Sequence, residues 1–350
     1  MNSQLLNSAT WQHGEVRLVC VERWHETHDV ISYRFQAEQP VKFQFKPGQF
    51  ITLLLDINGE RVGRSYTISS SPSRPYSIVL TIKTISDGLV SNYLADHLQV
   101  GHRILATGPD GVFNLVDIET EKYLFLSAGS GITPMYSMCR WLEDTQKGSD
   151  IAFLHSAKSP RDLIFHADLK QFDNVNEHFN LAYSLEEGEL QDGTAVVEGR
   201  FSVEWLANQV ADYQSRTIFV CGPAPYMQAV KSALIEAGFD MERYYQESFG
   251  GEPTSTVNQA AEQEAKPFML HISDKKVDLS AEQSLLEGIE KLGLPIIAAC
   301  RAGVCGACKC KVVKGEVESS SQMALTPEEI EQGFVLACST QLRSDALVEL

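Results

Sequence analysis

The stretch Cys300-Arg-Ala-Gly-Val-Cys305-Gly-Ala-Cys308 decides the fold of the C-terminal part of this chain. With the later Cys338 it gives the spacing C-x4-C-x2-C…C, which is typical of the thiolate ligands of a plant-type [2Fe–2S] cluster. Two irons that share four thiolates need three ligands on one tight loop and a fourth from another segment. We therefore predict that Cys300, Cys305, Cys308 and Cys338 bind a [2Fe–2S] cluster.

A zinc site and disulfide bonds are the alternatives for these cysteines, and both stay open at this point. A structural zinc site more often shows two C-x2-C pairs, whereas this stretch contains one. Disulfides would need an oxidising compartment. Cys310 forms a C-x-C with Cys308, and we interpret it as a neighbour of the cluster because four thiolates already complete the ligand set.

Composition and charge exclude several classes of protein. The length of 350 residues predicts two or three domains, and the formal net charge of −17 argues against nucleic acid or an anionic membrane as partner. The chain has no apolar run of membrane-spanning length, and residues 1–15 lack the apolar core of a signal peptide. Cysteines gathered in one cluster fit a reducing compartment. We expect a cytoplasmic, monomeric protein.

The hydrophobic pattern changes along the chain and predicts three domains. Residues 11–114 contain short runs rich in β-branched residues, with a hairpin signal at Asn58-Gly59, and favour an antiparallel β-barrel. Strands and helices alternate over residues 115–249, which predicts an α/β domain with a parallel sheet. Residues 250–267 have the composition of a flexible linker. Residues 268–350 then form a small α+β domain of ferredoxin type (β-grasp), with one helix near residues 281–292.

Two motifs in the barrel region have the chemistry of a flavin nucleotide site. In Arg64-Ser65-Tyr66-Thr67 the guanidinium can bind a pyrophosphate, the tyrosine offers a flat face, and a hydroxyl can bond a ring nitrogen. Lys83 ends a predicted strand, and Gly88-Leu-Val90-Ser91 resembles a helix N-terminus, where free amides bind phosphate. Taken alone, the first motif is also compatible with a plain barrel strand and the second with ordinary helix capping.

A glycine turn marks the start of the α/β region. Gly129-Ser130-Gly131-Ile-Thr133-Pro134 follows a predicted strand and opens a helix, where a dinucleotide pyrophosphate should bind. Pro134 replaces the third glycine of the G-x-G-x-x-G fingerprint and fits the first helical turn. Cys221-Gly222-Pro223 ends another predicted strand on the same side of the sheet. Taken alone, the glycine turn could be a plain strand–helix connection.

The order of these motifs resembles the ferredoxin–NADP⁺ reductase superfamily. The resemblance implies that Arg64, Tyr66 and Thr67 hold FAD, with Ser65 beside them, and that the turn 88–91, including Gly88, Val90 and Ser91, binds the flavin pyrophosphate. Lys83 is assigned to the same cofactor site.

The resemblance also implies where hydride transfer takes place. It places Thr133 against the nicotinamide, Cys221-Gly222-Pro223 near the nicotinamide and flavin N5, and Glu247 near N5. Together with Tyr66, the residues Thr133, Cys221 and Glu247 are the candidate catalytic residues. Phe249 would cover the flavin face, although it could instead be a core residue. We interpret Cys221 as a spacer, because hydride transfer needs no nucleophile.

Three modules in this order imply a direction of electron flow. NADH delivers two electrons as hydride, a [2Fe–2S] cluster accepts one, and a flavin connects the two stoichiometries. We predict an NADH-dependent oxidoreductase that passes electrons from NADH through FAD and the cluster to a metalloprotein. Lys158 and Arg161 could serve a 2′-phosphate, but the resemblance favours NADH. His155 is expected to pack on the adenosine side or to contact solvent.

The terminal acceptor is the least determined part of this prediction. The stretches 215–227 and 299–306 are similar to reductases of hybrid-cluster proteins, which makes a hybrid-cluster protein the first choice of acceptor. The same modules also suit the reductase component of a ring-hydroxylating or demethylating oxygenase. A third possibility, from another class, is a redox-sensing electron carrier without NADH turnover.

Overall fold

The computed structural model describes residues 9–118, 120–146, 148–249, 267–294, 296, 303, 306–322 and 325–350. The backbone divides into two compact units, one of residues 1–53 and 66–248, the other of residues 54–65 and 249–350. Of the predicted linker, Pro267 alone is among the described residues. Within the described ranges, no helix combines the length and the apolar character needed to cross a bilayer.

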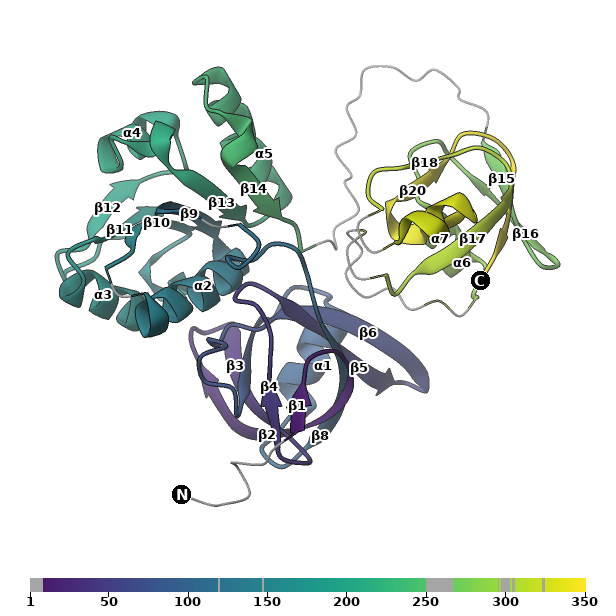
Figure 1. Cartoon of the computed structure of the whole chain (residues 1–350), viewed down its shortest axis with the longest axis horizontal. Coiled ribbons are helices and arrows are strands. Elements are labelled where there is room, and N and C mark those ends of the chain that lie inside the picture. The colour runs from purple at the N-terminus through teal and green to yellow at the C-terminus, as the bar shows by residue number, and fades with distance from the viewer. Residues whose placement is uncertain are drawn as a thin grey trace. The chain divides into compact units, whose positions relative to one another are not determined.

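The N-terminal region is a six-stranded β-barrel sheet with the strand order β6-β5-β8-β2-β3-β7 (Figure 1). Its strands are β2 (Gly14–His25), β3 (Val30–Ala37), β5 (Phe50–Ile57), β6 (Glu60–Thr67), β7 (Ile78–Lys83) and β8 (Arg103–Asp110). A short parallel pair adds β1 (Ala9–Trp11) and β4 (Val41–Phe43). Asn58 and Gly59 both have positive φ at the β5–β6 turn, which confirms the hairpin. Helix α1 (Leu89–His97) follows β7.

The α/β region is a fully parallel sheet with the order β12-β11-β10-β9-β13-β14. The strands are β9 (Lys122–Ala128), β10 (Asp150–Ala157), β11 (Phe179–Leu185), β12 (Ala195–Glu198), β13 (Thr217–Cys221) and β14 (Tyr244–Glu247). Helices α2 (Ile132–Thr145) and α3 (His166–Val175) pack on one face, and α4 (Val203–Gln209) and α5 (Ala224–Glu236) on the other. The strand order reverses between β9 and β13, which is where ligands bind in open α/β sheets.

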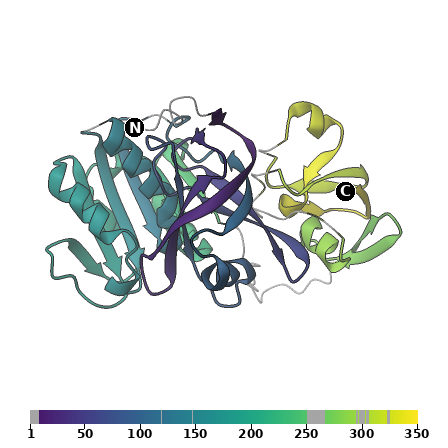
Figure 2. The same cartoon turned by 90° about the horizontal axis from the view of Figure 1, so that it is seen from below.

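Barrel and α/β region pack directly on each other within the first unit, and Figure 2 shows the barrel strands beside the parallel sheet. Ser137 on α2 donates to the carbonyl oxygen of Ser70 at 2.8 Å, and Arg74 pairs with Asp144 at 2.9 Å. A Cβ on Gly48 of the barrel would lie 2.6 Å from the terminal methyl carbon of Met138 on α2, so the two regions approach closely at a residue without a side chain. The interface is therefore closely packed.

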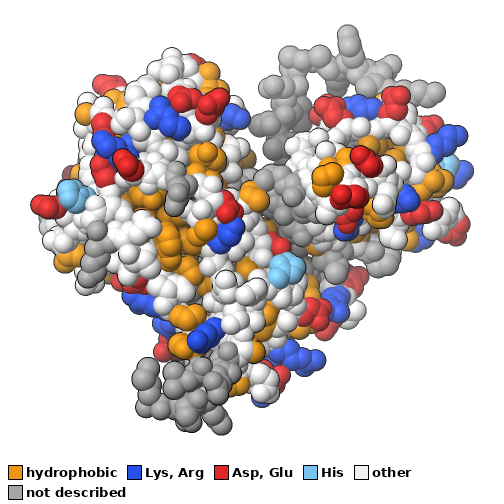
Figure 3. All heavy atoms as spheres, viewed as in Figure 1, with side chains coloured by type: hydrophobic (Ala, Val, Ile, Leu, Met, Phe, Trp, Pro, Cys, Tyr) orange, Lys and Arg blue, Asp and Glu red, His pale blue; other side chains and the backbone are white. Residues whose placement is uncertain are grey.

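The C-terminal domain is a five-stranded mixed sheet with the order β16-β15-β21-β17-β19. Its elements are β15 (Phe268–Ile272), β16 (Lys275–Leu279), α6 (Leu285–Lys291), β17 (Lys309–Lys314), β18 (Val317–Ser319), α7 (Pro327–Glu331), β19 (Phe334–Leu336), β20 (Thr340–Leu342) and β21 (Ala346–Glu349). Helix α6 is shorter than predicted because Ser284 starts it with a capping box to Glu287. Figure 3 shows acidic and basic side chains interspersed over the visible face.

Candidate active site

The glycine turn joins β9 to α2 at the reversal point of the sheet. Gly129 to Gly131 form one 3₁₀ turn, and Gly129 has a φ of 52°. A Cβ on Gly131 would lie 2.3 Å from the carbonyl oxygen of Cys221 and 2.6 Å from the nitrogen of Gly222. The two motifs predicted for the dinucleotide are therefore neighbours, and their contact requires a glycine.

The first turn of α2 is built as predicted. Thr133 is 3% exposed and donates its hydroxyl to the carbonyl oxygen of Ser130 at 3.1 Å. Pro134 lies in the first helical turn, where a missing N–H is tolerated. The free amides at this N-terminus can face a pyrophosphate. The contact of Thr133 with a nicotinamide stays a prediction.

Cys221 ends β13 with its side chain fully buried. It is the register partner of both Ser127 on β9 and Glu247 on β14. Burial, and secondarily the Glu247 carboxylate, raise the pKa of the Cys221 thiol well above its ordinary value. The thiol is therefore neutral at physiological pH, in keeping with a spacer.

The predicted flavin strand is β6, whose last residue is Thr67. Arg64, Ser65 and Tyr66 are partly exposed, whereas Thr67 is 5% exposed. The Thr67 hydroxyl is buried and finds no hydrogen-bond partner among the described residues. Because an unsatisfied buried hydroxyl is unfavourable, a flavin ring nitrogen at this point would satisfy it. The residues present thus fit FAD.

The helix start at Gly88 also fits a phosphate. A Cβ on Gly88 would lie 2.5 Å from both the hydroxyl of Ser91 and a side-chain carbon of Ile85, so the turn is closed. Val90 is 2% exposed and anchors the first turn of α1 in the core, while Ser91 accepts from the amide of Ile85 at 3.4 Å. These contacts keep the N-terminal amides of α1 in place.

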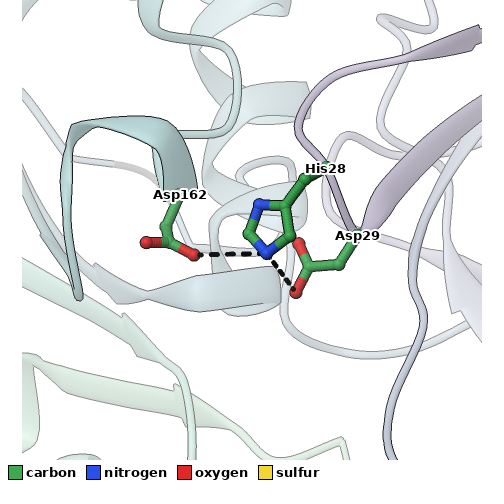
Figure 4. Close-up of side chains that lie close together, drawn as sticks. All are labelled: His28, Asp29 and Asp162. Carbon is green, nitrogen blue, oxygen red and sulfur yellow. Dashed lines mark ion pairs between the residues drawn. The ribbon is translucent and has the colours of Figure 1, made fainter.

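Lys83 lies at the end of β7 and pairs with Asp29 at 2.7 Å. Figure 4 shows His28 between Asp29 of the barrel and Asp162 of the α/β region, with Nε2 3.8 and 4.0 Å from their carboxylates. These three side chains could surround a cation, but Lys83 already supplies positive charge to Asp29. We interpret this group as an electrostatic contact between the two regions, and the assignment of Lys83 to the flavin stays a prediction.

The structure excludes one of the two environments that were predicted for His155. Its side chain is fully buried, which makes the expected solvent contact wrong. Nδ1 lies 2.8 Å from the hydroxyl of Ser127, and the ring contacts Tyr183 edge to face. Burial lowers the pKa of His155 to about 3, so the imidazole is neutral.

Two of the four predicted cluster ligands can be located. Cys308 is 2% exposed and Cys338 is partly buried, while Cys300 and Cys305 lie outside the described residues. The amide of Gly303 donates to Sγ of Cys338 at 3.2 Å, and the amide of Cys338 donates to Sγ of Cys308 at 3.4 Å. Hydrogen bonds from backbone amides to cysteine sulfurs stabilise the thiolates that bind a [2Fe–2S] cluster. This part of the loop fits the cluster.

Two serines beside the cluster loop were not predicted from the sequence. Ser321 donates to the carbonyl oxygen of Gly303 at 2.7 Å, and Ser339 donates to the carbonyl oxygen of Ser321 at 2.9 Å. A Cβ on Gly303 would lie 2.7 Å from the Cβ atoms of both serines. Ser339 follows Cys338 directly, which was the available signal, whereas Ser321 gave none.

The burial of Phe249 decides between its alternative interpretations, whereas the burial of Cys310 does not. Cys310 is 2% exposed and belongs to the hydrophobic core of the C-terminal domain, but so does the predicted ligand Cys308, and the interpretation of Cys310 as a neighbour of the cluster stays a prediction. Phe249 is 42% exposed, so the alternative of a core residue is wrong. Its role at the flavin stays a prediction.

Three family models match consecutive parts of the chain. An oxidoreductase FAD-binding domain matches residues 17–115, an oxidoreductase NAD-binding domain residues 125–232, and a 2Fe-2S iron-sulfur cluster binding domain residues 270–343. The glycine betaine monooxygenase reductase subunit of Chromohalobacter salexigens is 42% identical over 98% of both chains. The chain belongs to the ferredoxin–NADP⁺ reductase superfamily. It is an NADH oxidoreductase that depends on FAD and a [2Fe–2S] cluster. The match to a 2Fe-2S cluster binding domain therefore favours the cluster over the zinc and disulfide alternatives for the cysteines.

Further relatives have other names. The stachydrine N-demethylase reductase subunit of Rhizobium meliloti is 34% identical over 97% of both chains. NADH oxidoreductase HCR of Escherichia coli is 34% identical over 87% of this chain and 89% of its own. Among solved structures, phthalate dioxygenase reductase aligns with a TM-score of 0.63 and 21% identity over 96% of this chain and 98% of its own. That structure supports the three-domain fold.

Proposed function

We propose that this NADH oxidoreductase is the reductase component of an oxygenase, with a glycine betaine monooxygenase as the first candidate partner. The supporting observation is 42% identity to such a reductase subunit over 98% of both chains. A second relative with the same name, from Pseudomonas aeruginosa, is 40% identical over the full length of both chains. Similarity of this extent includes the C-terminal domain, from which the electrons leave.

A hybrid-cluster protein is the second candidate acceptor. The stretches 215–227 and 299–306 resemble reductases of hybrid-cluster proteins, and NADH oxidoreductase HCR of Escherichia coli is a relative at 34% identity. That similarity is lower and covers less of the chain than the similarity to the glycine betaine monooxygenase reductases. We therefore rank the oxygenase first.

Separate groups of residues bind the dinucleotide, the flavin and the cluster. The glycine turn and the start of α2 hold the dinucleotide, and Thr133 and the buried Cys221 lie at this turn. Thr67 and the amides before α1 hold the flavin nucleotide. When bound, FAD accepts a hydride and releases electrons one at a time. The amides of Gly303 and Cys338 stabilise the sulfurs of the cluster that receives them.

An electron-transfer assay with two acceptors tests the proposal. The holoenzyme and NADH are mixed anaerobically with the oxygenase component of a glycine betaine monooxygenase or with a hybrid-cluster protein, and reduction of each acceptor is followed spectroscopically. We expect faster reduction of the oxygenase. Reduction of the hybrid-cluster protein alone would reverse our ranking, and reduction of neither would show that the acceptor belongs to another class.

A further inference from the structure

A row of buried hydroxyl groups crosses the barrel sheet where it meets the α/β region. Ser69 is 1% exposed, Ser32 fully buried and Thr81 6% exposed. The hydroxyl oxygens of Ser69 and Thr81 are 2.9 Å apart, and those of Thr81 and Ser32 are 2.7 Å apart. Three hydroxyls from three separate segments of the barrel thus form one continuous hydrogen-bonded row.

The row ends on a carboxylate at the surface. Ser32 donates its hydroxyl to Oε1 of Glu26 at 2.6 Å, and the indole N–H of Trp24 donates to the same oxygen at 2.7 Å. Glu26 is only partly buried, so its other side can exchange protons with water. Burial raises the pKa of Glu26, the hydrogen bonds from Ser32 and Trp24 oppose this, and the nearby Asp168 adds to the increase.

The other end of the row lies next to the predicted flavin contact. Ser69 follows Thr67 by two residues, so in extended backbone both side chains lie on one face, about 7 Å apart. Strand β7, which carries Thr81, also lies against the Gly129–Gly131 turn. Ser69 is thus close in the chain to a residue assigned to FAD, and its partner Thr81 is on a strand that contacts the turn assigned to the dinucleotide.

The donor directions are consistent along the whole row. Because Ser32 donates to Glu26, Thr81 can donate to Ser32, and Ser69 to Thr81. The Ser69 oxygen is then left as an acceptor for an incoming proton. Ser69 can alternatively donate to the carbonyl oxygen of Val79 at 3.1 Å, which gives its hydrogen a second position when the row resets.

The reaction of this NADH oxidoreductase leaves one proton over. A hydride carries two electrons and one proton, and two electrons leave singly through the cluster. For each NADH oxidised, one proton must therefore leave the flavin site for water.

We propose that Ser69, Thr81 and Ser32 conduct this proton from the flavin site to Glu26, which releases it to solvent. The proposal rests on the NADH-to-FAD half of the function and is independent of the final acceptor. Besides Asp168, the ionisable groups facing Glu26 from the α/β region are Tyr136 and, beside Asp168, Arg140. Ser32 and Thr81 are register partners on β3 and β7, so the strand pairing fixes their contact.

Single-turnover proton release tests the proposal in the holoenzyme. NADH-reduced protein is mixed with ferricyanide in weakly buffered solution, and a pH-indicator dye and flavin absorbance are followed together. Glu26→Gln and Thr81→Val should each slow proton release and flavin reoxidation by about tenfold or more. Formate should partly restore Glu26→Gln by accepting the proton. Thr217→Val, which removes another buried hydroxyl remote from the row, is the matched control and should behave as wild type.

A second readout needs no flavin. In cofactor-free protein, the infrared carboxyl band that disappears in Glu26→Gln should titrate above the ordinary value for a glutamate. Wild-type rates of proton release in both Glu26→Gln and Thr81→Val would overturn the proposal, as would a Glu26 band that titrates at or below the ordinary value. If Thr81→Val fails to bind FAD, the rate measured with Glu26→Gln decides alone. A failure of oxygenase reduction would leave these outcomes unaffected, because ferricyanide replaces the protein acceptor.

Discussion

The dinucleotide turn and the cluster loop both contain a glycine that tolerates no side chain, but different interactions hold them. Gly131 is fixed by backbone contact with Cys221 and Gly222 at the end of a buried strand. Gly303 is fixed by two hydrogen bonds: its amide donates to Sγ of Cys338, and its carbonyl oxygen accepts from the hydroxyl of Ser321. The first arrangement needs only packed protein, whereas the second uses sulfur atoms that iron must also bind. We therefore expect the dinucleotide turn to persist without a cofactor and the cluster loop to depend on its metal.

The largest effect should follow from Cys308→Ser, which removes a cluster ligand. Iron content and electron output to a protein acceptor should fall to background, while NADH should still bleach the flavin at a rate within about twofold of wild type. Cys310→Ala is the matched control because Cys310 is equally buried but is not one of the four predicted ligands, and it should retain the cluster. Wild-type output from Cys308→Ser would show that the cluster is not on the electron path.

Gly131→Ala tests the close packing of the dinucleotide turn. The added Cβ would lie 2.3 Å from the carbonyl oxygen of Cys221, so the turn must shift. We expect a loss of about 1–3 kcal/mol in unfolding free energy and about 100-fold slower flavin reduction by NADH, since small misplacements are costly. Thermal unfolding and stopped-flow absorbance measure the two effects.

Gly129→Ala is the control for the stability effect. A Cβ there meets nothing within 4 Å, and only the positive φ opposes it. Its cost should be about 1 kcal/mol. An equal loss of stability in the two variants would show that close packing is not what requires a glycine at Gly131.

Substitution of Arg216 tests how much a buried ion-pair network contributes to the stability of the α/β region. This guanidinium is buried at the opposite end of the sheet and binds Asp150 at 2.7 Å and Asp212 at 2.8 Å. Burial alone would raise the pKa of Asp212, but hydrogen bonds from Arg216 and Lys122 lower it below its ordinary value. Because both carboxylates are partly exposed, Arg216→Met should cost about 2 kcal/mol at pH 7.

The pH dependence of that loss has a defined sign. A carboxyl whose pKa is lowered by folding contributes stability above its unfolded pKa of about 4, and this is lost as pH falls through the folded value. The difference between wild type and Arg216→Met in urea unfolding should therefore shrink below about pH 4. A constant difference down to about pH 2 would mean that packing, not charge, is responsible.

The smallest expected effect concerns Thr67→Val at the flavin strand. The substitution removes a buried hydroxyl that lacks a partner in the described structure, so the apoprotein should melt at the same temperature or slightly higher. FAD affinity should fall roughly 3- to 10-fold, corresponding to one lost hydrogen bond. Calorimetry of the apoprotein and fluorescence titration with FAD separate the two effects. Unchanged affinity would remove Thr67 from the flavin site.

Features confined to one short segment were predicted well. The glycine turn before α2, the Asn58-Gly59 hairpin and the alternation of strands and helices depend on neighbouring residues, and they occur where predicted. Features that depend on side-chain surroundings were predicted less well. His155 could be placed at a strand end, but its full burial could not be predicted, because burial depends on Ser127 and Tyr183 from neighbouring strands.

The sequence alone determined the order of cofactors, since cysteine spacing, glycine turns and turn residues are local chemistry. Only the tertiary structure decided which of these meet. The contact of Gly131 with Cys221 joins segments far apart in the chain, and Ser32 reaches Thr81 across 49 residues. The physical reason is that strand order and register bring such residues together, and neither is encoded within a single segment.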